Sequence, residues 1–460
     1  MRFWIVIIFL STFLLHIPTF AGLDTDFQIY SLSSKLIFSG LIPYEDFWAD
    51  NKPPFYYLLL LPGNLIGGKL ISFFIIHLLI VSTIGVLLFY IGSKLNREFD
   101  PIVGIYSWLS FQLLTVIQFI EYGNMNGSIV YAVILFELIS LIFFKKLIND
   151  DEYKSIYRDT VCLGLLGGVA FFTRYSLTIF AIYLLTIFFR MIQGAYSLRF
   201  SIKLIFIFSV VTMIPLCIII YALSISFSDL LQYTFSYNVS YSGGIDPFRI
   251  LHDAFNTTRG LLNYLQPIFL NAAPILLFFL YQNKNKIFNE EKFVNKLYLI
   301  LLLIIPVTLH SLILYKLSFS SQAIMIVINL LFFILILVVL MLITNNRNDV
   351  SFSSKEKLLN AFKKIPLIQY ILLGYLILEY IQITIFGTGT KQYPFFFIFA
   401  PFCLIIGSLF NNLYRSRNST IYKYNEIELL TRYNKLVPTL VLILFCAYNY
   451  NQNITSNIER

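Results

Sequence analysis

Charged residues are scarce in this chain of 460 residues. Asp, Glu, Lys and Arg make up 12% of it, about half the fraction typical of soluble domains, while 58% is hydrophobic and the mean hydropathy is +0.78. Apolar runs near the roughly 20 residues that a helix needs to cross a bilayer recur from end to end. The composition therefore excludes a set of soluble domains and predicts an all-α polytopic membrane protein, with residues 1–460 as one membrane domain.

Cysteines and common cofactor motifs are also scarce. The four cysteines, Cys162, Cys217, Cys403 and Cys446, lie in apolar segments without the spacing of a zinc site or a disulfide framework. Neither a P-loop nor a GxGxxG motif is present. The net charge of +9 comes from basic residues scattered singly between apolar runs, so we predict no nucleic-acid partner.

The apolar runs predict about thirteen transmembrane helices. We interpret the N-terminal run as a retained first helix, although residues 19–21 weakly resemble a signal-peptidase site. The apolar stretch 56–67 is interrupted by Pro62 and Gly63 and is too short to span, so we expect it in the membrane interface. The predicted helices cover residues 3–20, 71–92, 102–119, 127–144, 160–173, 175–190, 204–224, 266–282, 297–315, 323–343, 366–386, 395–410 and 436–449.

Basic residues divide unevenly between the two sides of the membrane. With the N-terminus inside, 24 of the 33 Lys and Arg residues fall in cytoplasmic segments and 9 in outer ones, as the positive-inside rule requires. This orientation places two large loops outside, the first outer loop at residues 21–55 and the fourth at residues 225–265. The turn at residues 387–393 also faces outward.

The first outer loop is the most polar stretch next to the membrane. Carboxylates beside aromatic rings at a bilayer surface suit chemistry on a polar group carried by a lipid, although an ordinary connecting loop with interfacial aromatics has the same composition. Residues 24–54 hold five of the 24 acidic residues together with Lys35, Lys52 and several aromatics; the acidic residues are Asp24, Asp26, Glu45, Asp46 and Asp50.

Two further outer positions carry cations. Arg174 falls at the outer end of a predicted helical hairpin, as either a snorkelling arginine or a guanidinium that holds a phosphate. Lys391 and Tyr393 lie on the glycine-containing turn 387–393, whose backbone can approach a ligand closely. The fourth outer loop is rich in Tyr, Phe, Asn and Ser, which fits either acceptor binding or interfacial packing.

Two acidic residues, Glu137 and Glu379, fall inside predicted helices. A carboxylate at bilayer depth is costly unless it is protonated or paired, and such residues commonly belong to proton or ion relays. Because only two occur, we favour buried, hydrogen-bonded structural roles for both.

The spacing of residues in the first outer loop is specific. Reading along it gives Asp26, Tyr30, Gly40, Pro43, Tyr44, Asp46, Lys52, Pro53 and Pro54, and weaker motifs follow at Gly164, Gly168, Thr173 and Arg174 and at Tyr393 and Pro394. This pattern resembles that of the GT-C superfamily of polyprenyl-phosphate-sugar-dependent glycosyltransferases. The branch that it resembles most contains protein O-mannosyltransferases, the lipid A aminoarabinose transferase and related bacterial lipopolysaccharide glycosyltransferases.

The resemblance implies a GT-C-like fold and an inverting sugar transfer outside the membrane. The donor is a polyprenyl-phosphate sugar, and the acceptor is a lipid, a glycan or a protein. Apart from the resemblance, the richness in Ile, Asn, Lys, Phe and Tyr suggests AT-rich coding, and a bacterial inner membrane, whose lipids surround the chain, is the expected location. The implied roles are a general base at Asp26, with Asp24 as its alternative, donor phosphate binding at Lys52, Arg174 and Lys391, and substrate binding at Tyr30, Tyr44, Asp46 and Tyr393.

The chain departs from the family pattern at three positions. Phe27 follows Asp26 where relatives commonly have a second acid, Asn51 stands where some relatives have a metal-ligating Glu or His, and Gln392 stands where His is usual. No cofactor is therefore certain. A divalent metal cation is possible, with Asp46 and Asp50 as weak candidate ligands.

Two alternative functions remain at the level of the sequence. A polyprenyl-linked glycan polymerase or ligase also uses lipid-linked donors and outer-loop charges. A lipid or glycan transporter would show inverted repeats and paired intramembrane charges, and neither is visible here. Changes to the first outer loop should inactivate a glycosyltransferase, whereas loss of charges inside the helices should inactivate a transporter.

Overall fold

The computed structural model describes about half of the chain. It covers residues 2–17, 25–47, 55–95, 100–122, 128–149, 152–236, 371–375, 377, 378 and 404. Apart from one isolated bridge between Pro43 and Phe47, the regular structure of these residues is helical. The all-α fold class predicted from the sequence is confirmed for this part of the chain.

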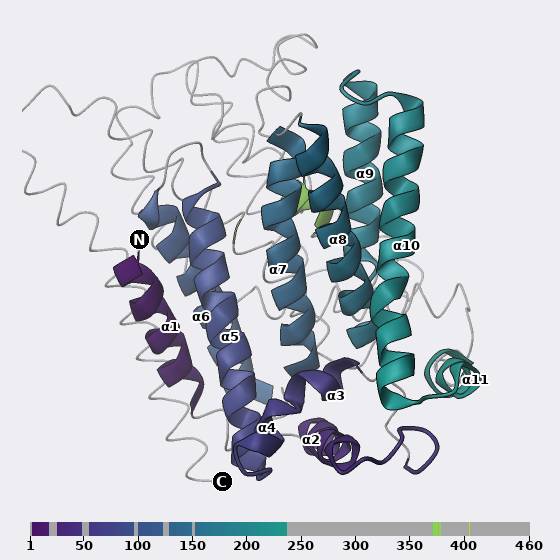
Figure 1. Ribbon diagram of the computed structural model, residues 1–460. Coiled ribbons are helices and arrows are strands. Elements are labelled where there is room, and N and C mark those ends of the chain that lie inside the picture. The colour runs from purple at the N-terminus through teal and green to yellow at the C-terminus, as the bar shows by residue number, and fades with distance from the viewer. Residues whose placement is uncertain are drawn as a thin grey trace, which may run out of the picture.

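The helices form an upright bundle with short helices gathered at one end (Figure 1). The helices are α1 (Arg2–His16), α2 (Thr25–Phe38), α3 (Phe55–Leu60), α4 (Pro62–Leu65), α5 (Leu70–Ser93), α6 (Pro101–Tyr122), α7 (Ser128–Asn149), α8 (Tyr153–Arg174), α9 (Thr178–Ile192), α10 (Leu198–Leu223), α11 (Phe227–Leu230) and a π-helical turn, η2 (Leu231–Ser236).

Three helices, α5, α8 and α10, are long and apolar enough to cross a membrane, which indicates an integral membrane protein. The predicted total of thirteen spans is not shown. The helices predicted over residues 266–282, 297–315, 323–343 and 436–449 lie outside the described residues. Residues 371–375, 377 and 378 of the span predicted at 366–386 are helical, and they lie against α7, where Tyr375 contacts Phe144, and α9, where Gly374 faces Ile182.

The first outer loop and the stretch that follows it contain helices that the sequence did not predict. Residues 25–38 form the helix α2, which was not among the predicted helices, and the stretch 56–67 forms the two short helices α3 and α4. A left-handed Gly40, with φ of 88°, ends α2, and the amide of Leu41 donates to the carbonyl of Leu36. The prediction of a short helix at 160–173 was also wrong, because α8 begins at Tyr153.

Basic residues gather at one end of the bundle. We call the end that carries α2, α3, α4 and α11 the α2 end, which is the lower end in Figure 1, and the opposite one the basic end. Of the described Lys and Arg residues, three lie at the α2 end and nine at the basic end. Those at the α2 end are Lys35, Lys69 and Arg174, and those at the basic end are Arg2, Lys94, Lys145, Lys146, Lys154, Arg158, Arg190, Arg199 and Lys203. This division favours the basic end as the cytoplasmic one.

Thiol labelling tests this orientation. In a variant whose four cysteines are replaced by serine, Ser39→Cys at the exposed end of α2 should react with a membrane-impermeant maleimide in intact cells. Ala195→Cys, in the exposed turn between α9 and α10, should react only after permeabilisation. Ser33 is a poor probe because it is buried in α2. The reverse labelling pattern would overturn the orientation.

Close packing between α8 and α10 fixes the middle of the bundle. A Cβ built on Gly168 would lie 2.3 Å from the carbonyl oxygen of Thr212, and one built on Gly164 would lie 3.0 Å from that of Phe208. Only glycine allows this approach of two backbones, as is common where helices meet in membranes. Pro215 lies inside α10 at the same contact. Because proline has no backbone N–H, the carbonyl of Val211 lacks its usual hydrogen bond within the helix.

Substitution of two adjacent glycines should therefore have different effects on stability. Gly168→Ala should reduce stability by about 1–3 kcal/mol, because its methyl group overlaps backbone that cannot move freely. Gly167→Ala is the matched control, since its Cβ would make ordinary 3.5 Å contacts with side-chain carbons of Ile179, Phe180 and Phe208. Thermal unfolding in detergent measures the difference, and equal midpoints for the two variants would contradict the packing argument.

Candidate functional site

Helix α2 packs one face against the α2 end of the bundle. Phe27, Tyr30, Ser34 and Ile37 are buried along that face at spacings of three and four residues, while Leu32 is 57% exposed on the other side. The exposed side of α2 mixes the apolar Ile29, Leu32 and Phe38 with Gln28 and Lys35. Such a mixed surface at the end of a membrane bundle is typical of a helix in the membrane interface.

Asp26 lies in the first turn of α2. Residues 30, 33 and 37, which follow it by four, seven and eleven positions, are all buried. The backbone thus places Asp26 in the register of the buried face, one turn before Tyr30. Asp24, the alternative base, lies outside the described residues.

Tyr30 belongs to a cluster of buried tyrosines between α2 and α3. Its ring centroid lies 5.1 Å from that of Tyr56, with the planes at 85°, and 6.0 Å from that of Tyr57. All three side chains are at most 1% exposed. The geometry makes Tyr30 an anchor that fixes α2 on α3, and its predicted contact with substrate stays a prediction.

A tight turn at residues 42–47 follows α2. The Oδ2 atom of Asp46 accepts a hydrogen bond of 2.7 Å from the amide of Ile42, and the amide of Asp46 donates to the carbonyl of Ile42 at 2.9 Å. Tyr44 has a left-handed φ of 69°, and its amide donates to the carbonyl of Phe47 at 2.8 Å. The Asp46 carboxylate therefore closes this turn, whether or not it also binds substrate.

The first and fourth outer loops meet at Tyr44. Its ring stacks on that of Tyr233, with centroids 5.7 Å apart and planes at 6°. Tyr233 belongs to η2, which follows α11 at the start of the fourth outer loop. Two segments that are distant in sequence therefore share the α2 end, as the predicted topology required.

Arg174 is the last residue of α8 and is half-buried at the α2 end. The next residue, Tyr175, is left-handed with φ of 56°, and its amide donates to the carbonyl of Phe171, so the chain turns sharply into α9. Helix α3 contacts both α2 and α8. It therefore links the helix that carries Asp26 to the helix that ends in Arg174.

Glu137 secures the connection between α8 and α9. The carboxylate, on α7, is 2% exposed, and its Oε1 accepts a 2.9 Å hydrogen bond from the buried hydroxyl of Ser176. Ser140, which donates to the Glu137 carbonyl, also lies 2.5 Å from the hydroxyl of Tyr375. These bonds fit the structural role that the sequence favoured for Glu137; Glu379 lies outside the described residues.

Several predicted site residues lie outside the described part of the chain. These are Asp24, Asp50, Lys52, Lys391 and Tyr393, together with the fourth outer loop beyond residue 236. Among the residues that the structure does cover, no group of three His, Cys, Asp or Glu side chains could hold a metal ion. A metal site at Asp46 and Asp50 stays a prediction.

One further acidic residue, which was not among the predicted site residues, lies at the α2 end. Glu121 is the penultimate residue of α6, and α6 ends at the α2 end. A carboxylate next to a predicted membrane surface was the available signal, but a lone Glu after an apolar run carries no spacing pattern. Only the direction of α6 places it at the same end as Asp26.

Comparison of the chain with protein-family models, with curated proteins and with solved structures finds no match. The resemblance to the GT-C superfamily therefore rests on the motif residues of the first outer loop and of α8. Function has to be inferred from the residues of this chain and from where the fold places them.

Proposed function

We propose that the chain is a membrane glycosyltransferase that moves a sugar from a polyprenyl phosphate to a lipid, glycan or protein acceptor outside the cytoplasm. The observation that supports this most is that α3 contacts both α2, which carries Asp26, and α8, which ends in Arg174. A carboxylate and a guanidinium at one end of a membrane bundle suit a reaction that removes a proton and releases a phosphate.

The proposed reaction is a single displacement. The acceptor oxygen attacks the anomeric carbon from the face opposite the phosphate, so a new C–O bond forms as the bond from that carbon to the phosphate oxygen breaks. Asp26 takes the proton of the acceptor hydroxyl. The electron pair of the broken bond leaves with the polyprenyl phosphate, whose negative charge Arg174 and Lys52 stabilise.

The membrane setting supports these roles. A carboxylate at the boundary between water and lipid loses part of its hydration, which disfavours its charged form and makes it a stronger base. A lipid-linked donor is delivered in the plane of the membrane and requires no nucleotide-binding fold, in keeping with the absence of P-loop and GxGxxG motifs. The stack of Tyr44 on Tyr233 joins the first and fourth outer loops at the same end.

Substitution of two lysines, one in the first outer loop and one just after it, distinguishes a role in donor binding from a general effect of surface charge. Lys52→Ala should weaken donor binding by about tenfold or more, because charge-assisted hydrogen bonds to phosphate are strong and the two following prolines restrict the backbone that aims this lysine. Lys69→Ala should have little effect, since Lys69 is an exposed residue that precedes α5. A titration with polyprenyl-phosphate sugar in detergent measures both, and equal losses would reduce Lys52 to a surface charge.

A comparison of cells tests the proposed function. Mass spectrometry of lipid-linked sugars and surface glycans should show that cells without the gene accumulate one polyprenyl-phosphate sugar and lack that sugar on one glycan, lipid or protein. The wild-type gene should restore both, and a gene that carries Asp26→Asn should restore neither. Unchanged sugar composition in cells without the gene would contradict sugar transfer.

A further inference from the structure

His77 joins three helices near the α2 end of the bundle. It lies about two turns into α5 and is 3% exposed. The centroid of its ring is 6.0 Å from that of Phe27 on α2, 5.4 Å from that of Tyr131 on α7 and 5.8 Å from that of Phe74, which precedes it on α5. These three side chains are buried as well. His77 therefore links the first turn of α2 to α5 and α7.

The imidazole of His77 is held by packing rather than by a hydrogen bond at Nδ1. This atom is buried and has no hydrogen-bond partner among the described residues. The rings of Phe27 and Tyr131 meet that of His77 at 65° and 62°, and such edge-to-face contacts between aromatic rings are favourable. A buried nitrogen without a partner costs free energy. The stabilising contribution of His77 therefore comes from the shape of its ring.

The first turn of a helix depends strongly on its side-chain contacts. The amides of this turn have no carbonyl partner within the helix, so the backbone hydrogen bonds constrain it least. In α2, Phe27 belongs to this turn and directly follows Asp26. Tyr30 and Ser34 hold the later turns, through contacts with α3 and α4. The contact of Phe27 with His77 therefore acts on the turn that carries Asp26.

We infer that His77 is a positioning residue for the proposed base: its ring holds Phe27, and through Phe27 it fixes the backbone of Asp26 on the bundle. This inference rests on the proposed sugar transfer. Misplacement of a reacting group by about 1 Å can lower a rate by about 10²-fold, because attack requires a narrow geometry. Since His77 is buried beneath α2, it acts through Phe27 and not on the acceptor.

Steady-state kinetics of sugar transfer test this role. His77→Ala should lower kcat by about 10- to 100-fold and leave the KM for the polyprenyl-phosphate sugar within about twofold, because the proposed phosphate contacts come from Lys52 and Arg174. His77→Phe should keep most of the rate, since it retains an aromatic ring. A loss in His77→Phe equal to that in His77→Ala would overturn the role of the ring.

A double-mutant cycle tests whether His77 acts through Phe27. Phe27→Ala should lower kcat by a factor similar to that of His77→Ala. The double variant should be about as active as either single variant, because both substitutions remove the same contact. Effects that multiply in the double variant would show independent roles and overturn the inference.

Two variants at the basic end control for the general loss of a buried side chain. Phe89→Ala removes a buried ring from the same helix, one that lies 6.3 Å from the ring of Trp4. Asp159→Ala removes a buried side chain whose Oδ2, like Nδ1 of His77, has no hydrogen-bond partner in the described part of the chain. Neither should change the rate of transfer, and losses equal to that of His77→Ala would overturn the inference.

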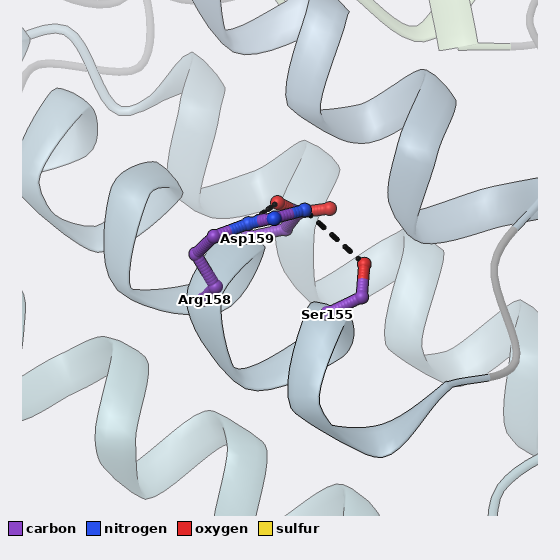
Figure 2. Close-up of polar contacts among 3 residues, drawn as sticks. All are labelled: Ser155, Arg158 and Asp159. Atoms are coloured by element: carbon purple, nitrogen blue, oxygen red, sulfur yellow. Dashed lines mark hydrogen bonds and ion pairs between the residues drawn. The ribbon is translucent and has the colours of Figure 1, made fainter.

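The contacts of Asp159 show why it is a suitable control. Its Oδ1 accepts a 3.1 Å hydrogen bond from Nε of Arg158, and Nη2 of Arg158 donates to the hydroxyl of Ser155 at 3.3 Å (Figure 2). These bonds stay within α8, at the end of the bundle opposite to α2. Loss of Asp159 therefore changes packing and charge without a described contact to the turn that carries Asp26.

The motion of α2 tests the inference independently of sugar transfer. In a variant whose four cysteines are replaced by serine, a nitroxide on Gln28→Cys reports on the start of α2 and one on Lys35→Cys on its last turn; both positions are exposed. Electron paramagnetic resonance should show that His77→Ala increases mobility at residue 28 and leaves residue 35 unchanged. Unchanged mobility at residue 28 would overturn the inference, whatever the rate of transfer. Increased mobility there, with no transfer by the wild type, would instead contradict the proposed function.

Discussion

Asp26→Asn is expected to lower the rate of sugar transfer by about 10²- to 10⁴-fold, the contribution typical of a general base. The amide keeps the size of the carboxylate but cannot accept the proton of the acceptor hydroxyl. Folding should be preserved, because the contacts that hold α2 on the bundle come from Phe27, Tyr30 and Ser34. Donor binding should also be preserved, since the proposed phosphate contacts come from Lys52 and Arg174. Transfer from a polyprenyl-phosphate sugar in detergent, measured beside donor affinity, gives both quantities.

Asp24→Asn is the matched control for this prediction. It changes the same chemical group two residues away, before α2 begins, and we expect it to keep most of the activity. The reason is that Asp26, unlike Asp24, stands four residues before Tyr30 within α2, in the register of the buried face. Full activity in Asp26→Asn with loss in Asp24→Asn would move the base to Asp24. Full activity in both variants would remove a carboxylate base from this loop.

Arg174→Gln is expected to lower the transfer rate by about 10²- to 10³-fold, as the loss of one fixed group that stabilises developing charge commonly does. Arg174 closes α8 beside a left-handed Tyr175, and the bond from Ser176 to Glu137 fixes the same connection. The guanidinium therefore starts from a well-defined backbone. Arg174→Lys should restore only part of the rate, because an ammonium cannot pair with two phosphate oxygens in parallel.

Arg190→Gln provides the control within the same helical hairpin. Arg190 lies in the last turn of α9, at the basic end, and its loss should leave transfer unchanged. A structural role of Arg174 alone would lower the unfolding midpoint and the rate together. We expect the rate to fall while the midpoint stays close to that of the wild type. Equal rates for Arg174→Gln and Arg190→Gln would contradict phosphate binding by Arg174 and favour the alternative of a snorkelling arginine.

The sequence predicted some helices closely and others poorly, for physical reasons. A helix was predicted over residues 71–92, and α5 covers Leu70–Ser93. The two agree because a uniformly apolar run has a high hydropathy along its whole length. Helix α8 begins seven residues before its predicted start, since its first two turns carry Lys154, Arg158 and Asp159 among tyrosines and fail a hydropathy criterion. Those residues lie at the end of the bundle, where long side chains reach water.

Part of the candidate site could be predicted from the sequence. Helix α2 was missed because its serines lower its hydropathy, yet Phe27, Tyr30, Ser34 and Ile37 have helical spacing that could have predicted it. The stack of Tyr44 on Tyr233 and the bond from Ser176 to Glu137 were not predictable. Such contacts join segments far apart in the chain and depend on how whole helices pack.

Release of polyprenyl phosphate is the most direct test of the proposed activity. The purified protein in detergent is incubated with each of a panel of polyprenyl-phosphate hexoses and pentoses, together with a membrane extract from cells that lack the gene as the source of acceptor. We predict that the wild type converts one donor to polyprenyl phosphate and an acceptor that carries the sugar in inverted configuration, and that Asp26→Asn converts none. Release of equal amounts by the wild type and Asp26→Asn, or no release from any donor, would contradict the proposal.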